Sequence, residues 1–456
     1  MHRMRRGCLI AGLLIWIAFG PRPSQAQYTA NFQTNIISGV TSNWSGSYSV
    51  GRTNFANVLL IQNSGVLSNW ASYLGWGIGG SNNTVVVTGD GSVWNGDALY
   101  VGYAGSCNSL IISNGGRVVS AISDAAVTGY VGHDAGTRSN RIVVTGPGSV
   151  WTNSTSRLDV PWAAIAIGNG GTDHSMTIAN GGQVFSAGAV VGRLFGGGGS
   201  SNNSVLVTGA GSVWNNNGTL NVGSGANANS LVISNGGKVV CEAYPFRPSG
   251  CAVYGTTNNT AMIVAGGVWQ CNGTLSIGGC FFEYGDGLSN NLMVAGGSVF
   301  ASNLTVCCGN LVQLDDGSII LTNAGMNGTL DVRGKFVLNG GVLQVDRLVM
   351  TSDCTHFIHT GGTLIVGNVV LDPNTFRIVS VARQSNDMLV TWMMGPGATN
   401  TLQAAAGDGN GGYSTNGFTD IFIITNNTTI GTITNYLDLG GATNTPSRYY
   451  RARLTL

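Results

Sequence analysis

Residues 85–94 read Val-Val-Val-Thr-Gly-Asp-Gly-Ser-Val-Trp. The same pattern returns with small changes at residues 142–151 and 205–214, and worn copies of it end at Trp269 and Phe300. A run of branched apolar residues favours a short strand, and the glycines that follow supply the positive φ angles of a tight turn. The stretch therefore predicts a strand, a sharp turn and a second strand that begins with Val and an aromatic residue.

A second motif lies between copies of the first and reads Ile-Ser-Asn-Gly-Gly or Ile-Ala-Asn-Gly-Gly. It carries Asn114, Asn180 and Asn235, a residue type that tolerates the left-handed turn conformation. Short strands that end in a hydrophobic-Gly pair, such as 101–102 and 131–132, accompany many units. A unit spans about 28 residues and holds two or three short strands.

A unit of this size cannot bury a hydrophobic face on its own, but stacked units can. The pattern therefore predicts an all-β protein whose main domain is a parallel β-solenoid of about 28-residue units. About twelve such units make a rod about 60 Å long, in which equivalent residues stack about 4.8 Å apart. Two adjacent ladders are expected from this stacking: Val93, Val150 and Val213 beside Trp94, Trp151 and Trp214. The rival architecture, a β-propeller, needs blades of about 40–50 residues.

The composition agrees with this architecture and argues against several others. Of the 456 residues, 72 are Gly, and charged residues make up 9%, against a usual share of about 25%. The chain has two Lys and two Glu, so good helix formers are scarce and neither a helical bundle nor a βαβ enzyme is expected. A hydrophobic share of 43% argues against a disordered chain.

The two motifs, in their alternating order, resemble the bacterial repeat associated with type V secretion (autotransporter) and PEP-CTERM proteins. The resemblance covers residues 56–300. It implies an exported, surface-related β-helical passenger, and it carries no catalytic residues over to this chain. The chain departs from the family in its tail, where we read neither an outer-membrane barrel nor a Pro-Glu-Pro sorting signal, so its mode of retention at the surface stays open.

The first 26 residues are predicted to be a signal peptide. Three Arg precede an apolar stretch over residues 8–19, and Ser-Gln-Ala at 24–26 matches a small-x-small cleavage site. Without this segment the chain carries 16 basic and 19 acidic residues and no further run long enough to span a bilayer. We expect an exported protein, either extracellular or on the outer cell surface, with the periplasm as the alternative. No nucleic-acid partner is expected, because no basic stripe is present.

The solenoid is predicted to span residues 27–372. Its motifs are clearest over 56–300, and residues 301–372 keep short strands with Gly turns, which we interpret as irregular terminal rungs. Residues 375–456 carry longer strands, typical of a small β-sandwich. The Leu-Val-Thr-Trp and Tyr-Tyr-Arg-Ala-Arg segments there resemble a fibronectin type III-like module of secreted bacterial proteins, which implies a cap on the solenoid or an attachment module.

Eight cysteines remain after removal of the leader, in a compartment that favours disulfides. Proximity in the sequence suggests local bridges between Cys241 and Cys251 and between Cys271 and Cys280. The vicinal pair at 307–308 has the alternative of bonding to neighbouring rungs. Because eight cysteines allow 105 connectivities, the pairing stays open.

Histidines offer few sites for a metal or for catalysis. Cys354 and His356 are the candidate metal ligands, since on a strand they share a face while His359 points the other way. The competing interpretation is a disulfide-bonded cysteine beside surface histidines, and we expect no metal or other cofactor. Asp173 and His174 lie in a Gly-rich turn, where no motif places a nucleophilic Ser beside them.

Asp315 and Asp316 are the candidate catalytic carboxylates, because many β-helical proteins act on polysaccharides and glycosidases use paired acids. Adjacent Asp residues on a strand face opposite sides, so the preferred interpretation is a pair of solvated turn residues. Trp94, Trp151 and Trp214 also have two interpretations, a stripe that stacks on sugars or a packed ladder. Their fixed position beside an apolar Val favours packing.

These observations predict an exported, non-enzymatic structural or adhesive protein, with a polysaccharide or a cell-surface protein as its partner. Two alternatives stay open: a carbohydrate-binding β-helix without turnover, and a polysaccharide lyase or hydrolase. The enzyme predicts a concave cleft with clustered Asp, Arg or His side chains. The adhesive protein predicts an even wall that is poor in charge.

Overall fold

All regular elements in the described part of the chain are β-strands. The computed structural model describes residues 28–122, 127–155, 164–194, 199–242, 249–280, 287–352, 354–371, 377–394, 399–408, 412–425, 432–443 and 447–455. The leader predicted over residues 1–26 lies outside these ranges. One sheet contains 33 strands and two small sheets contain three strands each, so the predicted all-β class is confirmed.

Most strands of the large sheet pair in parallel with the strand three positions later, so the pairings follow three ladders. Ladder A contains β1 (Thr34–Ser38), β4 (Val58–Gln62), β7 (Thr84–Thr88), β10 (Ser109–Ser113), β13 (Arg141–Thr145), β16 (Ser175–Ala179), β19 (Ser204–Thr208), β22 (Ser230–Ser234), β25 (Thr260–Val264), β27 (Asn291–Val306), β28 (Leu311–Leu321), β30 (Lys335–Leu338) and β32 (His356–His359). Ladder B contains β2 (Thr41–Asn43), β5 (Val66–Ser68), β8 (Val93–Gly96), β11 (Arg117–Ile122), β14 (Val150–Thr155), β17 (Gln183–Ser186), β20 (Val213–Asn216), β23 (Lys238–Cys241), β26 (Val268–Ile277), parts of β27 and β28, β31 (Val342–Met350) and β33 (Thr363–Leu371). Ladder C contains β3 (Tyr48–Val50), β6 (Ala71–Leu74), β9 (Ala98–Val101), β12 (Gly129–Val131), β15 (Ile165–Ile167), β18 (Ala189–Arg193), β21 (Leu220–Ser224), β24 (Ser249–Val253), parts of β26 and β27, β29 (Thr329–Val332) and parts of β31 and β33.

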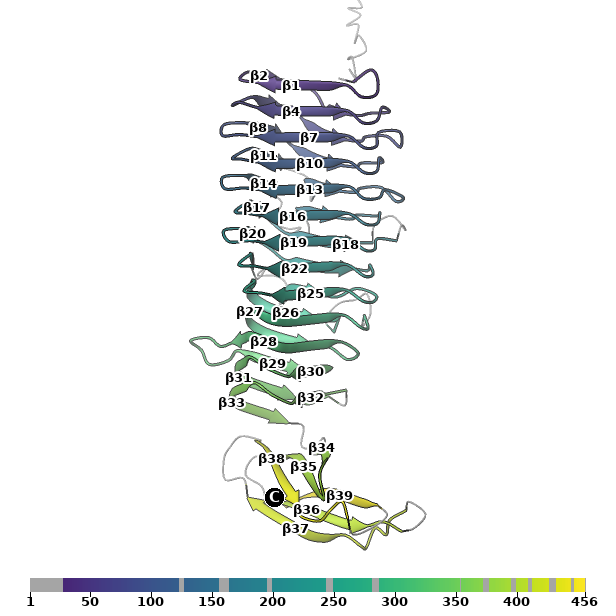
Figure 1. Cartoon of the computed structure of the whole chain (residues 1–456), viewed down its shortest axis with the longest axis vertical. Helices are drawn as coiled ribbons and strands as arrows, with labels where there is room; N and C mark the ends of the chain where they lie inside the picture. Colours follow the sequence, from purple (N-terminus) through teal and green to yellow (C-terminus); the bar gives the residue numbers. More distant parts are fainter. Residues whose placement is uncertain are drawn as a thin grey trace, which may run out of the picture.

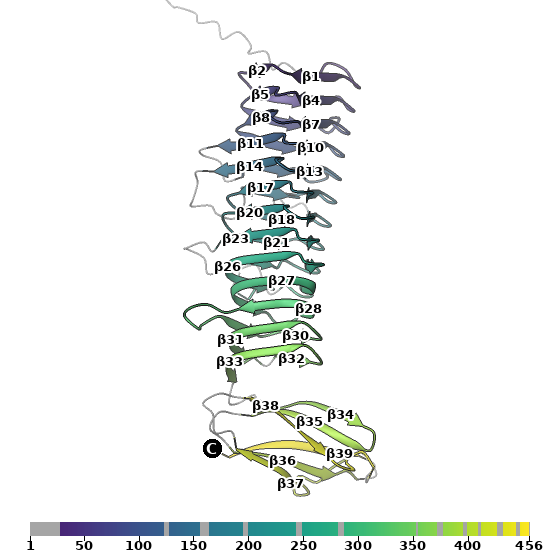
Figure 2. The ribbon, with the colours of Figure 1, turned by 60° about the vertical axis from the view of Figure 1, so that its left-hand side comes forward.

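Three consecutive strands, one from each ladder, make one layer of a stack. Figure 1 shows the layers following one another along the long axis from β1 to β33, and Figure 2 shows the same order after a turn of 60°. Neighbouring layers are in register over whole strands, as β7 and β10 show. The backbone hydrogen bonds of the parallel ladders therefore join one layer to the next.

The two sequence motifs occupy the same place in alternate layers. Val87 of the first motif is the partner of Ile112 of the second motif. Ile112 is in turn the partner of Val144, which belongs to the next copy of the first motif. One motif therefore corresponds to one layer, and the same motif returns only after two layers.

This alternation corrects the predicted tryptophan ladder. Trp94 and Trp151 are not neighbours, because Val118 lies between them as the partner of both. Val184 separates Trp151 from Trp214 in the same way. The outward positions beside them also alternate, in the order Val93, Arg117, Val150, Gln183 and Val213. A large side chain that alternates with a small one fills a close-packed interior without strain.

The tryptophans belong to the core. In β7 and β16 the second and fourth residues are buried and the others are half-buried, which is the period of two expected of strands. Trp94, Trp151 and Trp214 are at most 1% exposed, so they are not available to stack on a ligand. Their indole N–H groups donate inside the stack, to Asn69 at 2.7 Å, Ser120 at 3.1 Å and Ser186 at 3.0 Å, respectively.

A column of amide side chains, which the sequence analysis did not identify, runs through the interior where each layer enters ladder A. The backbone N–H of Asn57 donates to Oδ1 of Asn83 at 3.0 Å, and the N–H of Asn83 donates to Oδ1 of Asn108 at 3.0 Å. Later layers repeat this contact. The members are at most 2% exposed, and we name them the asparagine column: Asn57, Asn83, Asn108, Asn140, His174, Asn203, Asn229, Asn259, Asn290 and Asn310. The column pairs backbone groups that would otherwise be buried without a partner.

The C-terminal strands form two antiparallel sheets around a second core. One sheet contains β34 (Ile378–Gln384), β35 (Asp387–Met394) and β38 (Thr432–Asp438), and the other contains β36 (Thr399–Ala406), β37 (Thr419–Thr425) and β39 (Arg448–Thr455). Trp392 and Leu402 are fully buried in this core, with Phe422 and Tyr436 packed against it. The domain boundary predicted between residues 372 and 375 lies outside the described residues.

Side chains of the C-terminal sheets reach the last layer of the stack. Met393 belongs to the main buried cluster of the stack, which extends to Phe357, and Val379 packs against that cluster. The Arg377 guanidinium donates a hydrogen bond to the carbonyl of Thr355. These contacts are those expected of a cap, because the last layer of a stack otherwise exposes its apolar interior and its unpaired strand edge.

Candidate functional site

The two candidate catalytic carboxylates lie in β28, and each has its own hydrogen-bond partners. Asp315 accepts from the side-chain amide of Gln313 at 2.8 and 2.9 Å and from that of Asn339 at 2.8 Å. Asp316 accepts from the backbone N–H of Gly317 at 2.7 Å. These separate contacts argue against an acid pair, and the two residues lie within strand β28 rather than in the predicted turn.

The candidate metal site is corrected by the pairing of its cysteine. Cys354 forms a disulfide with Cys308, and a disulfide sulfur is not the thiolate that a metal site needs. Nδ1 of His356 lies 2.9 Å from the carbonyl oxygen of Cys354, so this ring has a backbone partner. The two residues therefore do not act as a ligand pair in this structure.

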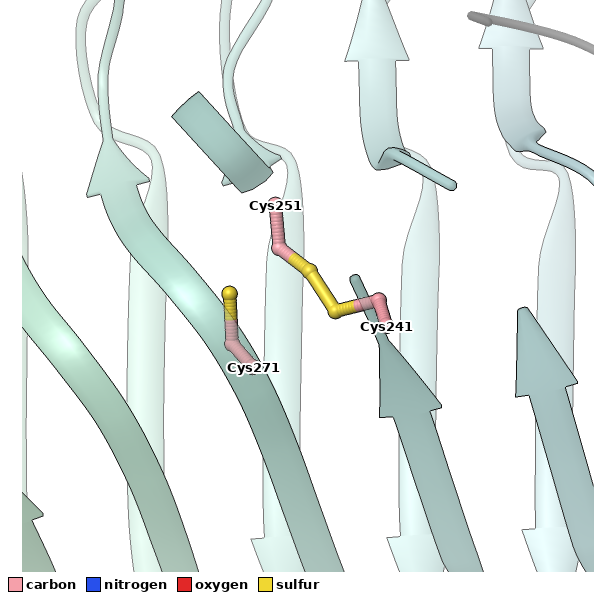
Figure 3. Close-up of side chains that lie close together, drawn as sticks. All are labelled: Cys241, Cys251 and Cys271. Atoms are coloured by element: carbon pink, nitrogen blue, oxygen red, sulfur yellow. A yellow bond between two sulfur atoms is a disulfide. The ribbon is translucent and has the colours of Figure 1, made fainter. Parts of the chain in front are cut away.

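The disulfides agree with the sequence prediction at one place and differ at another. Cys241 and Cys251 are bonded, as expected, and Figure 3 shows the bond beside the free Cys271. The predicted bond between Cys271 and Cys280 is wrong, because Cys280 pairs with Cys307. Cys271 points into the core, where it is 1% exposed, whereas Cys280 lies in the turn after β26.

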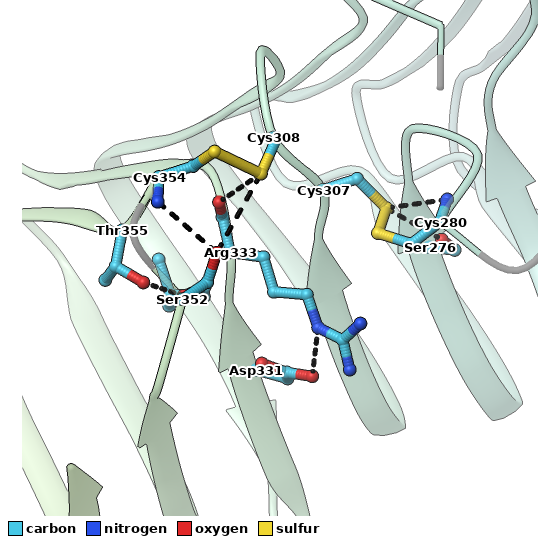
Figure 4. A network of polar contacts seen from close by, with 10 residues as sticks. Ser276, Cys280, Cys307, Cys308, Asp331, Arg333, Ser352, Cys354 and Thr355 are labelled. Atoms are coloured by element: carbon cyan, nitrogen blue, oxygen red, sulfur yellow. Dashed lines mark hydrogen bonds and ion pairs between the residues drawn. A yellow bond between two sulfur atoms is a disulfide. The ribbon is translucent and has the colours of Figure 1, made fainter. Parts of the chain in front are cut away.

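The vicinal cysteines bond to two different layers. Cys307 joins Cys280 and Cys308 joins Cys354, as Figure 4 shows. Beside them the Arg333 guanidinium and the Asp331 carboxylate form an ion pair at 2.9 Å. Cys307 therefore bonds to a neighbouring rung, as that alternative predicts. The bond of Cys308 passes the rung that ends at Arg333 and reaches the rung after it.

The asparagines of the second motif act as turn residues. Asn114, Asn180 and Asn235 have φ angles of 50°, 51° and 51°, the left-handed region that Asn tolerates. Each Nδ2 donates at 3.2 Å to a threonine hydroxyl in the preceding layer, on Thr88, Thr145 and Thr208, respectively. They join successive turns of the stack at its surface.

A row of tyrosines lies on the outward side of ladder C. Tyr73, Tyr100 and Tyr130 are direct partners in β6, β9 and β12. The ring centroids of Tyr73 and Tyr100 lie 4.8 Å apart with an interplanar angle of 9°, and those of Tyr100 and Tyr130 lie 4.9 Å apart at 6°. The spacing of parallel strands thus sets the spacing of the stacked rings.

A second row follows the glycine that ends each of these strands. The rings of Tyr103 and His133 stack at 4.5 Å and 10°, and those of Trp76 and Tyr103 lie 6.4 Å apart at 18°. The Arg52 guanidinium lies 4.4 Å from the centroid of the Trp76 ring, within the range of a cation–π contact. The second row therefore runs from a cation to an imidazole.

The two rows meet edge to face. Tyr103 makes T-shaped contacts with Tyr73 at 5.8 Å and with Tyr100 at 5.3 Å, and His133 makes one with Tyr130 at 4.6 Å. Such contacts are favourable for aromatic rings. We name the group the aromatic surface: Arg52, Tyr73, Trp76, Tyr100, Tyr103, Tyr130 and His133.

The glycines between the two rows connect the aromatic surface with the asparagine column. Gly102, between Tyr100 and Tyr103, has a φ angle of +79°, and a Cβ there would lie 2.1 Å from the side chain of Asn140. A larger residue would displace either the strand or the column. The rings are thus fixed to a rigid part of the fold.

The aromatic surface carries polar groups beside its rings. Burial raises the pKa of Tyr73 and Tyr130 above the ordinary value, so these phenols stay protonated and keep a hydroxyl donor. Trp76 is 37% exposed. Nδ1 of His133 lies 2.7 Å from the Asp134 carboxylate. The surface thus combines ring area, hydroxyl groups and one cation.

The aromatic surface was not predicted, although its pattern is present in the sequence. The hydrophobic-Gly pairs were identified as strand ends, but not the aromatic residues on either side of them. The pattern aromatic-x-Gly-aromatic occurs at residues 73–76, 100–103 and 130–133, in three successive layers. The equivalent positions of the next layer, 166 and 169, are Ala and Asn, so the aromatic surface is local.

Comparison with known proteins leaves the family open. No protein-family model matches the chain, and no curated protein matches it either. Among the residues that the structure describes, no helix has the length and hydropathy needed to cross a membrane.

Proposed function

We propose that this chain is an exported, non-enzymatic structural or adhesive protein. Its main part is a parallel β-solenoid that serves as a rod, its last residues are a fibronectin type III-like module, and the aromatic surface is where it binds its partner. The aromatic surface is the observation that supports this proposal most directly. Its rings lie in three successive layers, and the pairing of the strands sets the spacing of the rings.

The ladder pairings support a solenoid. Each layer hydrogen-bonds in parallel to the next over three short strands, and the asparagine column continues through ten consecutive positions. A stack of repeats in which each contacts its neighbours is the physical definition of such a rod. The three disulfides are compatible with an oxidising compartment, which agrees with the predicted leader.

A polysaccharide is the partner class that the aromatic surface favours. Tyrosine and tryptophan offer an apolar body with a polar tip, which suits ligands that present both C–H faces and hydroxyl groups. The exposed ring of Trp76 beside Arg52 is the most accessible part of this surface. Carbohydrate binding without turnover is therefore the second candidate function, and it specifies a polysaccharide as the partner that the first candidate leaves open.

The test is binding of the oxidised mature chain to a panel of insoluble and soluble polysaccharides. Each tube is read for depletion of protein and for released reducing ends or unsaturated products. We expect depletion without product, and we expect Trp76→Ala together with Tyr103→Ala to lower the retained fraction at least fivefold.

Trp70→Ala is the matched control, because Trp70 is 60% exposed and lies outside the aromatic surface. Its retention should equal that of the wild type. Equal retention of all variants would refute the aromatic surface as the binding site. Product release that disappears in Asp315→Asn with Asp316→Asn would replace the proposal with a polysaccharide-degrading enzyme.

A further inference from the structure

Three cysteines meet in the core where ladders B and C face each other. The sulfur atoms of Cys241, Cys251 and Cys271 all lie within 4.8 Å of one another, and all three residues are buried. Cys241 and Cys251 are bonded, and Cys271 is a free thiol (Figure 3). One thiol is therefore held beside a disulfide that it is able to attack.

The three residues come from two neighbouring layers. Cys241 ends β23 and Cys251 lies in β24 of the same layer, whereas Cys271 lies in β26 of the next layer. Cys241 and Cys271 are partners in ladder B. Cys251 is the partner of Leu220 and Leu275 in ladder C, so its side chain points to the interior from a position that is leucine in the layers on either side.

Comparison with earlier layers assigns a role to the position of Cys241. In two earlier layers that precede a tryptophan layer, as that of Cys241 does, the equivalent residues are Ser120 and Ser186. Each accepts a hydrogen bond from the indole N–H of the next layer. For Cys241 the equivalent indole is that of Trp269. Nε1 of Trp269 is buried and has no hydrogen-bond partner, so a donor is available at the place where a Cys241 thiolate would form.

We propose that Cys241, Cys251 and Cys271 form an internal thiol–disulfide exchange site that moves a disulfide from within one layer to a position between two layers. The Cys271 thiolate attacks Sγ of Cys251, the Cys251–Cys271 bond forms, and the Cys241–Cys251 bond breaks. The electron pair leaves with Sγ of Cys241, which takes up the proton that Cys271 released. One thiol and one disulfide are present before and after, so no oxidant or reductant is consumed.

The environment of the thiol sets the pace of the exchange. Burial raises the pKa of Cys271 to about 12, and a hydrogen bond with the backbone of Gly273 offsets only part of this rise. The thiolate is the attacking species. As long as the pH stays below this pKa, the exchange rate should therefore rise about tenfold for each unit by which the pH increases. The exchange is therefore slow at neutral pH and becomes measurable at alkaline pH.

The test is a map of the free thiol in the oxidised chain with Cys107→Ser, which removes the exposed thiol. Samples kept at pH 7 and pH 9 are acidified, unfolded, alkylated and digested for mass spectrometry. We expect two isomers, one with free Cys271 and one with free Cys241. Their ratio should settle about a hundredfold faster at pH 9 than at pH 7, at a rate independent of protein concentration.

A second arm isolates the new bond. In Cys241→Ser we expect a Cys251–Cys271 disulfide, and in Cys271→Ser the single bond Cys241–Cys251. The Cys280–Cys307 bond in the same digests reports that each variant has folded. The proposal is overturned by free Cys271 alone at both pH values, or by two free thiols in folded Cys241→Ser. An isomer with free Cys251 would overturn Cys251 as the point of attack.

Discussion

His174 occupies a position in the asparagine column that is otherwise filled by amides. Its ring Nδ1 accepts from the backbone N–H of Asn140 at 3.1 Å, and its backbone N–H donates to Oδ1 of Asn203 at 3.0 Å. The ring is fully buried, and burial lowers its pKa to about 4. A neutral imidazole that accepts at Nδ1 is thus a working substitute for an asparagine Oδ1.

The presence of His174 in the asparagine column makes the layer around β16 sensitive to acid. His174 binds a proton at about pH 6.5 in the unfolded chain but only at about pH 4 in the folded chain. The free energy of unfolding that His174 contributes above pH 6.5 is therefore lost as the pH falls toward 4. The loss at pH 4.5 should be about 2–3 kcal/mol. We expect His174→Asn to abolish this loss, measured as urea unfolding of this region at pH 7 and pH 4.5.

His356→Asn is the matched control for acid sensitivity, because His356 is exposed. It should leave the dependence on pH unchanged. An equal slope in wild type and His174→Asn would show that other groups cause the loss.

Among the repeated elements, the asparagine column should be the most sensitive to substitution. Oδ1 of Asn229 accepts from both the backbone N–H and the side-chain amide of Asn203, each at 3.0 Å. Asn229→Ala leaves the buried backbone N–H of Asn203 without a partner. It also removes one acceptor of the Asn203 side-chain amide, which keeps its bond to Ser200 at 2.9 Å, and the change should cost about 2–5 kcal/mol. We expect faster hydrogen exchange in β19 and β22, read by mass spectrometry, with distant layers unchanged.

Asn235→Gly provides the comparison at the surface. Asn235 has positive φ and a single hydrogen bond to Thr208, and Gly adopts this conformation without strain. The change should shift stability by less than about 0.5 kcal/mol. If both variants exchange alike, the column is not what fixes the layers.

The repeated motifs predict the strands and turns well, and they predict the internal contacts only in part. The Val runs and Asn-Gly turns fall where expected because local propensity sets them. The asparagine column was not predicted, because its asparagines precede the strands at irregular intervals in the sequence and His174 interrupts the series. The alternation of Trp94 with Val118 depends on which motif lies above which, and that follows from the register between layers rather than from either motif alone.

At the scale of the whole molecule, the disulfides between described residues support one part of the stack. The three disulfides lie between Cys241 and Cys354, while the layers from β4 to β22 rely on packing and on the asparagine column. Reduction should therefore raise hydrogen exchange in the strands from β24 to β32 and leave β4 to β16 as protected as before. Loss of protection throughout would show that the stack unfolds as a single unit.

The pairing of these cysteines could not be predicted from their positions in the sequence alone. Cys271 and Cys280 are nine residues apart, yet one points into the core and the other lies in a turn. Which residues meet across layers depends on the length of each connection. The aromatic surface could have been predicted from the sequence, because its pattern recurs at the hydrophobic-Gly pair of each of three successive layers.

The vicinal cysteines have a consequence for a protein that is pulled along its length. Tension that enters the chain at Cys280 passes through one disulfide to Cys307, across a single peptide bond to Cys308, and through the second disulfide to Cys354. The sequence separations of 27 and 46 residues correspond to roughly 250 Å of extended chain, which bears no load while both bonds are intact. The end of the stack nearest the C-terminal sheets would therefore resist extension as a short tether, and reduction would turn it into a long, compliant one.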